Sequence, residues 1–193
     1  RNLGTMSKIG LLTTGSAAAD FVARKLGDEP TLRGARIHPI AVLAALTTYR
    51  SGRGAKSDAT WTPVGKVIDA LDAAFYQTFR AIEPTGKRTM LALDVSGSMS
   101  GGQVAGVPGL TPRVASAAMA LITAATEANH GFVGFSTQLI ELAISPRQRL
   151  DDVITTVSGL PFAGTDCALP MTWALAQRRD IDVFVVYTDS ETW

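Results

Sequence analysis

The stretch that decides the fold reads TMLALDVSGS and covers residues 89–98. Residues 89–93 form a short, mostly apolar run, which is typical of a strand buried on both faces of a parallel sheet. Residues 94–98 read D-x-S-x-S, so that the carboxylate of Asp94 and the hydroxyls of Ser96 and Ser98 lie on the same side of a loop. In open α/β sheets, ligands bind beyond the carboxyl ends of the strands. Residues 94–98 therefore predict a ligand site at the end of this strand.

Beyond this stretch, strands and helices alternate along the chain. Such alternation predicts an α/β fold, a doubly wound and mostly parallel sheet with helices on both faces. Further strands are expected at residues 131–135, 139–144 and 183–187, the first two close enough to pair as a hairpin. Helices are expected at residues 114–128, 150–157 and 168–177. The last strand is strongly apolar and would leave an exposed sheet edge, so we expect further strands to follow and the domain to be incomplete.

The pattern before residue 86 is entirely helical. Apolar residues recur at helical spacing in residues 16–26, 39–49 and 63–82. Ser16 is the expected N-cap of the first helix, and Thr62 before Pro63 marks the expected start of the third. A turn at Glu83-Pro84-Thr85-Gly86 separates this half from the rest. We therefore expect two domains, a helical segment at residues 1–86 and an incomplete α/β domain at residues 87–193.

The composition permits a buried core but does not identify a ligand. The chain has 193 residues, 46% of them hydrophobic, and a net charge of +1, which neither requires nor excludes a nucleic acid. Cys167 is the only cysteine, so that no intrachain disulfide can form, and we interpret it as a small buried hydrophobe. No apolar run is long enough to span a bilayer, and we expect a cytoplasmic protein with no membrane partner.

Two more oxygen-bearing side chains follow predicted elements that end in the same crevice. Thr165 lies in a loop that leads into a helix, and Asp189 follows the last apolar strand. Together with Asp94, Ser96 and Ser98 they suit a hard cation, and we predict Mg²⁺ or Mn²⁺. The two serines are expected to ligate directly and Thr165 directly or through water, while the aspartates act largely through waters and hydrogen bonds. An open coordination position then remains for an acidic protein side chain or a phosphate.

This set of residues resembles the metal-ion-dependent adhesion site, or MIDAS, of von Willebrand factor A-type domains. The resemblance implies a binding module without catalytic residues. The alternative is a magnesium-dependent phosphatase of the haloacid dehalogenase type, with Asp94 as nucleophile and Asp189 holding Mg²⁺. Those enzymes need a second aspartate two positions on as acid and base, and Ser96 stands there instead. Because a hydroxyl cannot supply that step at neutral pH, we expect no enzyme.

Further stretches of the sequence resemble the Ro ribonucleoprotein autoantigen family, also called the TROVE-domain family. They are spread over nearly the whole chain: RNLG at 1–4, ARIHP at 35–39, ALDAAFY at 70–76, EPTGKR at 83–88, GTDC at 164–167, LPM at 169–171 and TDSET at 188–192. The resemblance implies the last part of a ring of HEAT-like helical repeats, followed by a partial von Willebrand A domain. It also implies binding of small non-coding RNA, including Y RNA and misfolded RNA, in RNA quality control. In bacterial relatives it implies cooperation with an exoribonuclease, polynucleotide phosphorylase.

Two basic groups are candidate RNA contacts. Arg33, Arg36 and His38 come just before a predicted helix, whose N-terminus would help to hold a phosphate. The alternative is a solvated loop in which His38 sets the entry of the helix. A second group lies in a Gly-rich loop that suits either a phosphate backbone or solvent: Arg50, Arg53 and Lys56.

Overall fold

The chain folds into two compact units. The structure, a computed structural model, describes residues 2–160 and 164–189. The first, which we call the helical unit, comprises Arg1–Ile82 and Ala105–Leu110, and the second, the sheet unit, comprises Glu83–Val104 and Thr111–Trp193. The division lies at residue 82 rather than at the expected residue 86, and a short segment from the expected α/β domain belongs to the helical unit.

The turn at residues 83–86 belongs to the sheet unit for a physical reason. The carboxylate of Glu127 accepts hydrogen bonds from the backbone N–H of Thr85 at 2.7 Å and from that of Gly86 at 3.2 Å. The bond from Thr85 is the main cause that lowers the pKa of Glu127 below its usual range. The turn is thus tied to the end of a helix of the sheet unit.

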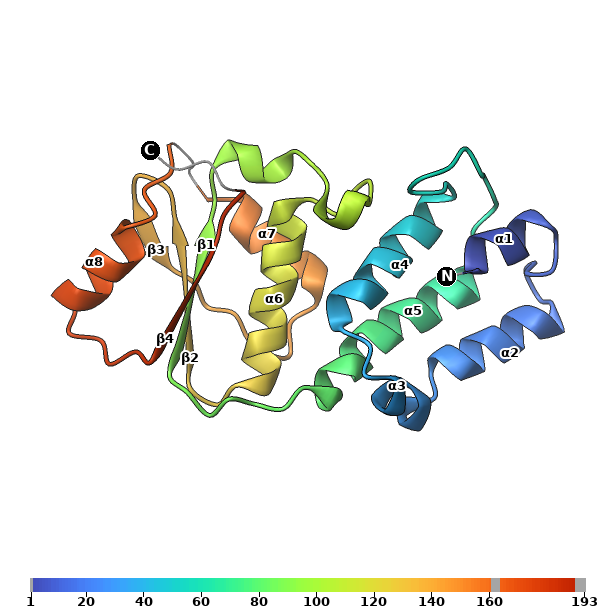
Figure 1. Cartoon of the computed structure of the whole chain (residues 1–193), viewed down its shortest axis with the longest axis horizontal. Coiled ribbons are helices and arrows are strands. Elements are labelled where there is room, and N and C mark those ends of the chain that lie inside the picture. Colours follow the sequence, from blue (N-terminus) through green and yellow to red (C-terminus); the bar gives the residue numbers. More distant parts are fainter. Residues whose placement is uncertain (1, 161–163, 190–193) are drawn as a thin grey trace. The chain divides into compact units, whose positions relative to one another are not determined.

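The helical unit is built around one amphipathic helix, α5. Its elements are α1 (Leu3–Lys8), α2 (Ala17–Leu26), α3 (Glu29–Ala35), α4 (Pro39–Ser51), α5 (Gly65–Gln77) and the 3-10 helix η1 (Thr78–Ala81). Helix α5 lies between α2 and α4 (Figure 1). Its apolar face is fully buried at Val67, Ala74 and Phe75, none of which is more than 1% exposed. Burial of this stripe stabilises the helix more than propensity does.

The predicted helices are present, with corrections at their ends. Ser16 caps α2 as expected, because its hydroxyl accepts a hydrogen bond from the N–H of Ala19 at 3.1 Å. The third helix, however, begins at Gly65 and not at Thr62 and Pro63. Val64 before it is extended, and its N–H donates to the buried hydroxyl of Tyr49 at 3.2 Å. This tertiary hydrogen bond holds the chain out of the helix.

The sheet unit has the predicted α/β fold. Its strands are β1 (Thr89–Asp94), β2 (His130–Phe135), β3 (Leu139–Glu141) and β4 (Val183–Tyr187), in the order β3-β2-β1-β4. Strand β1 is parallel to both β2 and β4, while β2 and β3 form the expected antiparallel hairpin. Because β1, β2 and β4 are parallel, their carboxyl ends meet at one edge of the sheet, which positions the site described below.

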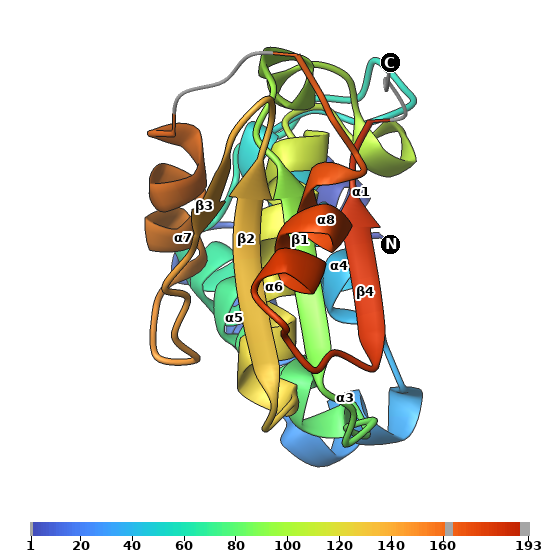
Figure 2. The same ribbon diagram turned by 90° about the vertical axis from the view of Figure 1, so that its left-hand side faces the viewer.

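Helices cover both faces of the sheet. Helices α6 (Pro112–Thr126) and α7 (Leu150–Ser158) pack side by side, with α6 on one face, and α8 (Leu169–Ala176) covers the other (Figures 1 and 2). Helix α6 is rich in alanine, and Ala117, Ala118 and Leu121 are completely buried. Small side chains let this helix approach the sheet closely. In the described ranges, no helix has both the length and the hydrophobicity needed to cross a membrane.

Candidate metal centre

Asp94 is the centre of a polar cluster at the carboxyl ends of the parallel strands. It is the last residue of β1, and its side chain is 0% exposed. Its Oδ1 accepts a hydrogen bond from the N–H of Ser96 at 2.7 Å. Its Oδ2 accepts from the hydroxyls of Thr165 at 3.2 Å and Thr188 at 2.9 Å. Asp94 thus joins three separate segments of the chain, and both of its oxygens are occupied by donors.

The two serines of the D-x-S-x-S loop lie side by side. Their hydroxyl oxygens are 3.0 Å apart. Ser96 is buried with 5% exposure, whereas Ser98 is exposed at the start of the 3-10 helix η2 (Gly97–Ser100). The hydroxyl oxygen of Ser96 therefore lies within the cluster, and that of Ser98 lies on its solvent-exposed side.

Asp189 carries the clearest sign of a missing partner. It follows Thr188, the residue that donates to Asp94, just beyond the end of β4. The Oδ1 atom of Asp189 is buried and has no hydrogen-bond partner within the described residues. A buried carboxylate oxygen without a donor carries a desolvation penalty. A cation, or a water bound to one, would remove that penalty.

The donor set of this cluster is made of hard oxygen ligands. Among the described residues, no three His, Cys, Asp or Glu side chains gather at one place, as many zinc sites require. Two carboxylates and several hydroxyls instead match the oxygen preference of Mg²⁺ and Mn²⁺. The structure brings Asp94, Ser96, Ser98 and Thr165 together, and Asp189 follows Thr188, whose hydroxyl donates to Asp94.

Arg113 is part of this region, although sequence reasoning did not single it out. Its side chain is 7% exposed, and Nη2 donates to the carbonyls of Val95 at 3.1 Å and Ser96 at 2.7 Å. A buried guanidinium thereby holds the backbone of the D-x-S-x-S loop. One signal was present in the sequence, because Arg113 is the sole charged residue of α6.

Thr188 is a second residue that was missed. It stands between the predicted last strand and Asp189, and its hydroxyl makes a shorter bond to Asp94 than that of Thr165 does. A hydroxyl residue at the end of a parallel strand beside β1 is the signal that could have identified it.

The candidate RNA contacts of the helical unit are exposed. Arg33 lies in the last turn of α3, and Arg36, with a positive φ of 47°, ends that helix in the left-handed region. His38 is the N-cap of α4, and its Nδ1 accepts a hydrogen bond from the N–H of Ile40 at 3.2 Å. His38 therefore sets the helix entry, one of the two roles expected for it, while Arg33 and Arg36 present their charges to solvent.

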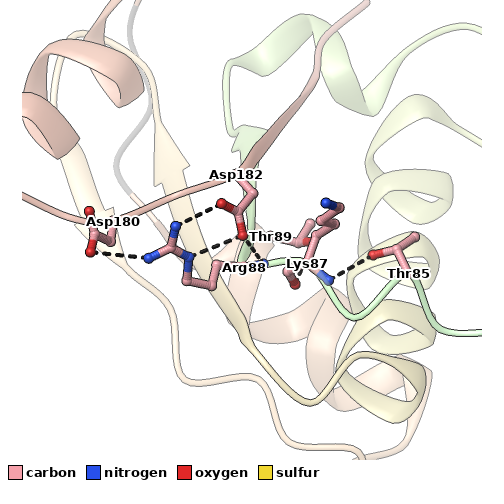
Figure 3. A network of polar contacts seen from close by, with 6 residues as sticks. All are labelled: Thr85, Lys87, Arg88, Thr89, Asp180 and Asp182. Carbon is pink, nitrogen blue, oxygen red and sulfur yellow. Dashed lines mark hydrogen bonds and ion pairs between the residues drawn. The ribbon is translucent and has the colours of Figure 1, made fainter.

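The opposite edge of the sheet, at the amino ends of β1 and β4, has its own charged cluster. Arg88 donates from Nη2 to Asp182 Oδ1 at 2.7 Å and from Nε to Asp182 Oδ2 at 3.0 Å, and it pairs with Asp180 at 3.1 Å (Figure 3). The Arg88 guanidinium holds the pKa of Asp182 well below its usual range. In addition, the backbone carbonyl of Arg88 accepts a hydrogen bond from the N–H of Asp182 at 2.9 Å. This cluster, the Arg88 clamp, fastens β4 to β1 in register.

The fold and the cluster at Asp94 define an A-type domain of the von Willebrand factor class. Residues 88–193 match the family model described as the Ro60 vWA domain. The chain belongs to the Ro60 family, as the resemblance in its motifs predicted.

Relatives of this family are similar over the whole chain. An RNA-binding protein RO60 of Deinococcus radiodurans is 47% identical over 100% of this chain and 36% of its own length. An RNA-binding protein RO60 of Caenorhabditis elegans is 44% identical over 100% of this chain and 29% of its own. The crystal structure of the Deinococcus radiodurans RO (RSR) protein superposes with a TM-score of 0.94, covering 100% of this chain and 39% of the other. The chain thus spans about a third of the length of its relatives.

Proposed function

We propose that this chain is part of a protein that binds small non-coding RNA, Y RNA and misfolded RNA among them, in RNA quality control. The observation that carries the proposal is the similarity of the whole chain, at 47% and 44% identity, to proteins named as RNA-binding. The helical unit, as the end of a HEAT-like ring, would hold RNA through exposed cations such as Arg33 and Arg36. An exoribonuclease such as polynucleotide phosphorylase is the proposed protein partner in bacteria.

We propose further that the cluster at Asp94 binds Mg²⁺, or Mn²⁺, as a MIDAS-type adhesion site. Ser96, Ser98 and Thr165 would hold the cation, and Asp94 and Asp189 would act through hydrogen bonds and bound water. The unpartnered buried oxygen of Asp189 supports this proposal. When bound, the cation supplies a positively charged position for an acidic side chain or a phosphate. Ser98 is the exposed member of the set, so that such a ligand would approach from its side.

The geometry argues against the phosphatase alternative. A nucleophilic carboxylate needs an oxygen that a phosphate can reach. Asp94 is 0% exposed, and both of its oxygens already accept hydrogen bonds. Ser96 stands where the acid and base of such enzymes would be needed, and its hydroxyl lies beside that of Ser98. The proposed role is therefore binding rather than catalysis.

The RNA proposal is tested by RNA affinity across a salt series, with the full-length protein. Replacing Arg33 and Arg36 by glutamine should weaken binding, and the log–log salt slope should fall by about 0.7–0.9 for each phosphate that is no longer neutralised. Ser98→Ala should leave the affinity nearly unchanged, because RNA is held by the cations of the helical unit.

A matched control replaces two exposed arginines of the sheet unit, Arg147 and Arg178, by glutamine. This control removes the same charge but should keep the wild-type slope. If Ser98→Ala or EDTA abolishes binding while the Arg33/Arg36 variant behaves as wild type, the RNA is held through the metal. The proposed division of roles would then be wrong.

A further inference from the structure

A cavity of about 360 Å³ lies within the helical unit, beside α1, α4 and the loop that joins α4 to α5. Its volume is within the range of small-molecule sites in proteins. The described residues that line it are all uncharged, and several are small, such as Gly4, Ala45 and Ala59. Hydroxyls of Thr5, Thr48 and Ser57 add polar groups to this lining. The cavity thus suits a flat, uncharged group that carries hydrogen-bonding atoms.

The side chain of Trp61 forms one wall of the cavity and is held in place by its neighbours. Its indole N–H donates to the carbonyl of Tyr49 at 3.0 Å, and the two rings stack with centroids 6.1 Å apart. The ring also lies directly on α1, since a Cβ atom added to Gly4 would come within 2.7 Å of it. Gly4 is therefore needed for the close approach of Trp61. A wall fixed from two sides loses little entropy when a ligand binds.

The rim of the cavity is basic. Arg53 and Lys56 alternate in the sequence with lining residues Gly54, Ala55 and Ser57, and both are exposed. Arg50, next to Tyr49, is exposed as well. Within residues 50–60 only Asp58 opposes these three cations. No ion pair involves Arg53 or Lys56 among the described residues, so that their charges remain available to a ligand.

We infer that this cavity is a nucleotide subsite for single-stranded RNA, an inference that rests on the proposed RNA-binding function. The uncharged cavity takes one base, and Arg53 and Lys56 at the rim contact the flanking phosphates. An uncharged pocket beside a cationic rim matches the two parts of a nucleotide, a neutral base and an anionic backbone. On this inference, the basic side chains of the loop at residues 50–60 contact RNA phosphates rather than solvent alone.

The test fills the cavity without disturbing the core. Ala45 is an exposed lining residue of α4, and Ala45→Leu should reduce the affinity of the full-length protein for a short oligouridylate about tenfold, the effect of losing one bound base. Ala41→Leu is the matched control, since Ala41 is also exposed, lies one turn earlier on α4 and is not among the residues that line the cavity. Replacing Arg53 and Lys56 by glutamine should lower the salt slope by about 0.7 for each phosphate that is no longer neutralised.

A photo-crosslink locates the base directly. An oligouridylate with a single 4-thiouridine should crosslink within residues 54–61 of the wild type, and Ala45→Leu should remove that product. If Ala45→Leu binds the oligonucleotide as tightly as wild type and the crosslinks map elsewhere, the cavity is not a base subsite, although the protein binds RNA. If the wild type binds no oligonucleotide at all, the proposed function itself fails, and the subsite with it.

Discussion

The two edges of the sheet use carboxylates in opposite ways. At the amino ends of the strands, Asp182 and Asp180 face Arg88, so that each carboxylate has a cation built into the chain. At the carboxyl ends, the donors to Asp94 within the described residues are hydroxyl and amide groups, and one buried oxygen of Asp189 has no donor there. At the first edge each carboxylate is paired with an arginine. At the second edge no ion pair to Asp94 or Asp189 is found among the described residues, because the buried Arg113 donates to the carbonyls of Val95 and Ser96 instead.

This difference separates a structural contact from a candidate binding site. Exposed ion pairs such as the Arg88 clamp contribute little to stability, because water and salt screen them. Buried carboxylates without a cation cost free energy unless a ligand compensates them. The edge with the unsatisfied oxygen is therefore the one where a cation is expected.

The largest effect is expected from the loss of Asp94. Asp94→Ala leaves the N–H of Ser96 and the hydroxyls of Thr165 and Thr188 without their acceptor in a buried place. We expect a loss of about 3 kcal/mol in the free energy of unfolding, because unpaired buried groups cost about 1–3 kcal/mol. Urea unfolding of the full-length protein measures this loss. Asp182→Ala at the opposite edge is the control and should lower the free energy of unfolding clearly less. Equal losses would show that the hydrogen bonds to Asp94 do not stabilise the fold more than the Arg88 clamp does.

The response to Mg²⁺ should be smaller and confined to one edge. At about ten times its dissociation constant, Mg²⁺ should add roughly 1.4 kcal/mol to the stability of the wild type. The double variant Ser96→Ala/Ser98→Ala should lose this gain, while Asp182→Asn should keep it. Thermal melts with Mg²⁺ or with EDTA make the comparison.

A substitution of Arg113 tests whether the Mg²⁺ response depends on the position of the D-x-S-x-S loop. Arg113→Met keeps both serines but removes the donor to the carbonyls of Val95 and Ser96, so that the loop is no longer held in place. We expect a reduced Mg²⁺ response, and the exposed Arg147→Met serves as control. An equal response to Mg²⁺ in the wild type and in the double serine variant would mean that the metal site is misassigned.

The smallest effect concerns acid. The pKa of Asp182 is lowered in the folded chain, first by its hydrogen bonds with Arg88, and that of Glu127 is lowered by the N–H of Thr85. A depressed carboxyl pKa stabilises the fold above the unfolded value of about 4, and this stability is lost as the pH falls from there toward the folded pKa. Asp182→Asn should therefore flatten the decline of stability below about pH 4. If the stability of Asp182→Asn declined below about pH 4 as steeply as that of the wild type, the Arg88 clamp would not contribute to the pH dependence of stability.

Much of the fold could be read from the residues themselves. The apolar runs at β1 and β4 and the hairpin of β2 and β3 predicted the sheet, because continuous apolar sequence is typical of strands in a parallel sheet. Of the two runs, β1 is buried, whereas β4 is only partly buried. The helices α1 and α3 escaped prediction, since six and seven residues are too few for a clear helical period. The start of α5 was misplaced because the hydroxyl of Tyr49, distant in sequence, binds the N–H of Val64.

For the candidate site, local sequence determined the ligand types and tertiary structure determined their roles. The D-x-S-x-S turn after a strand is a local pattern, and it predicted where Asp94, Ser96 and Ser98 lie. That Thr165 and Thr188 both donate to Asp94, that Arg113 holds the loop, and that an oxygen of Asp189 lacks a donor are all long-range facts. They depend on which chain segments the parallel sheet brings to one edge, and the burial that makes an unpaired oxygen costly exists only once the chain is folded.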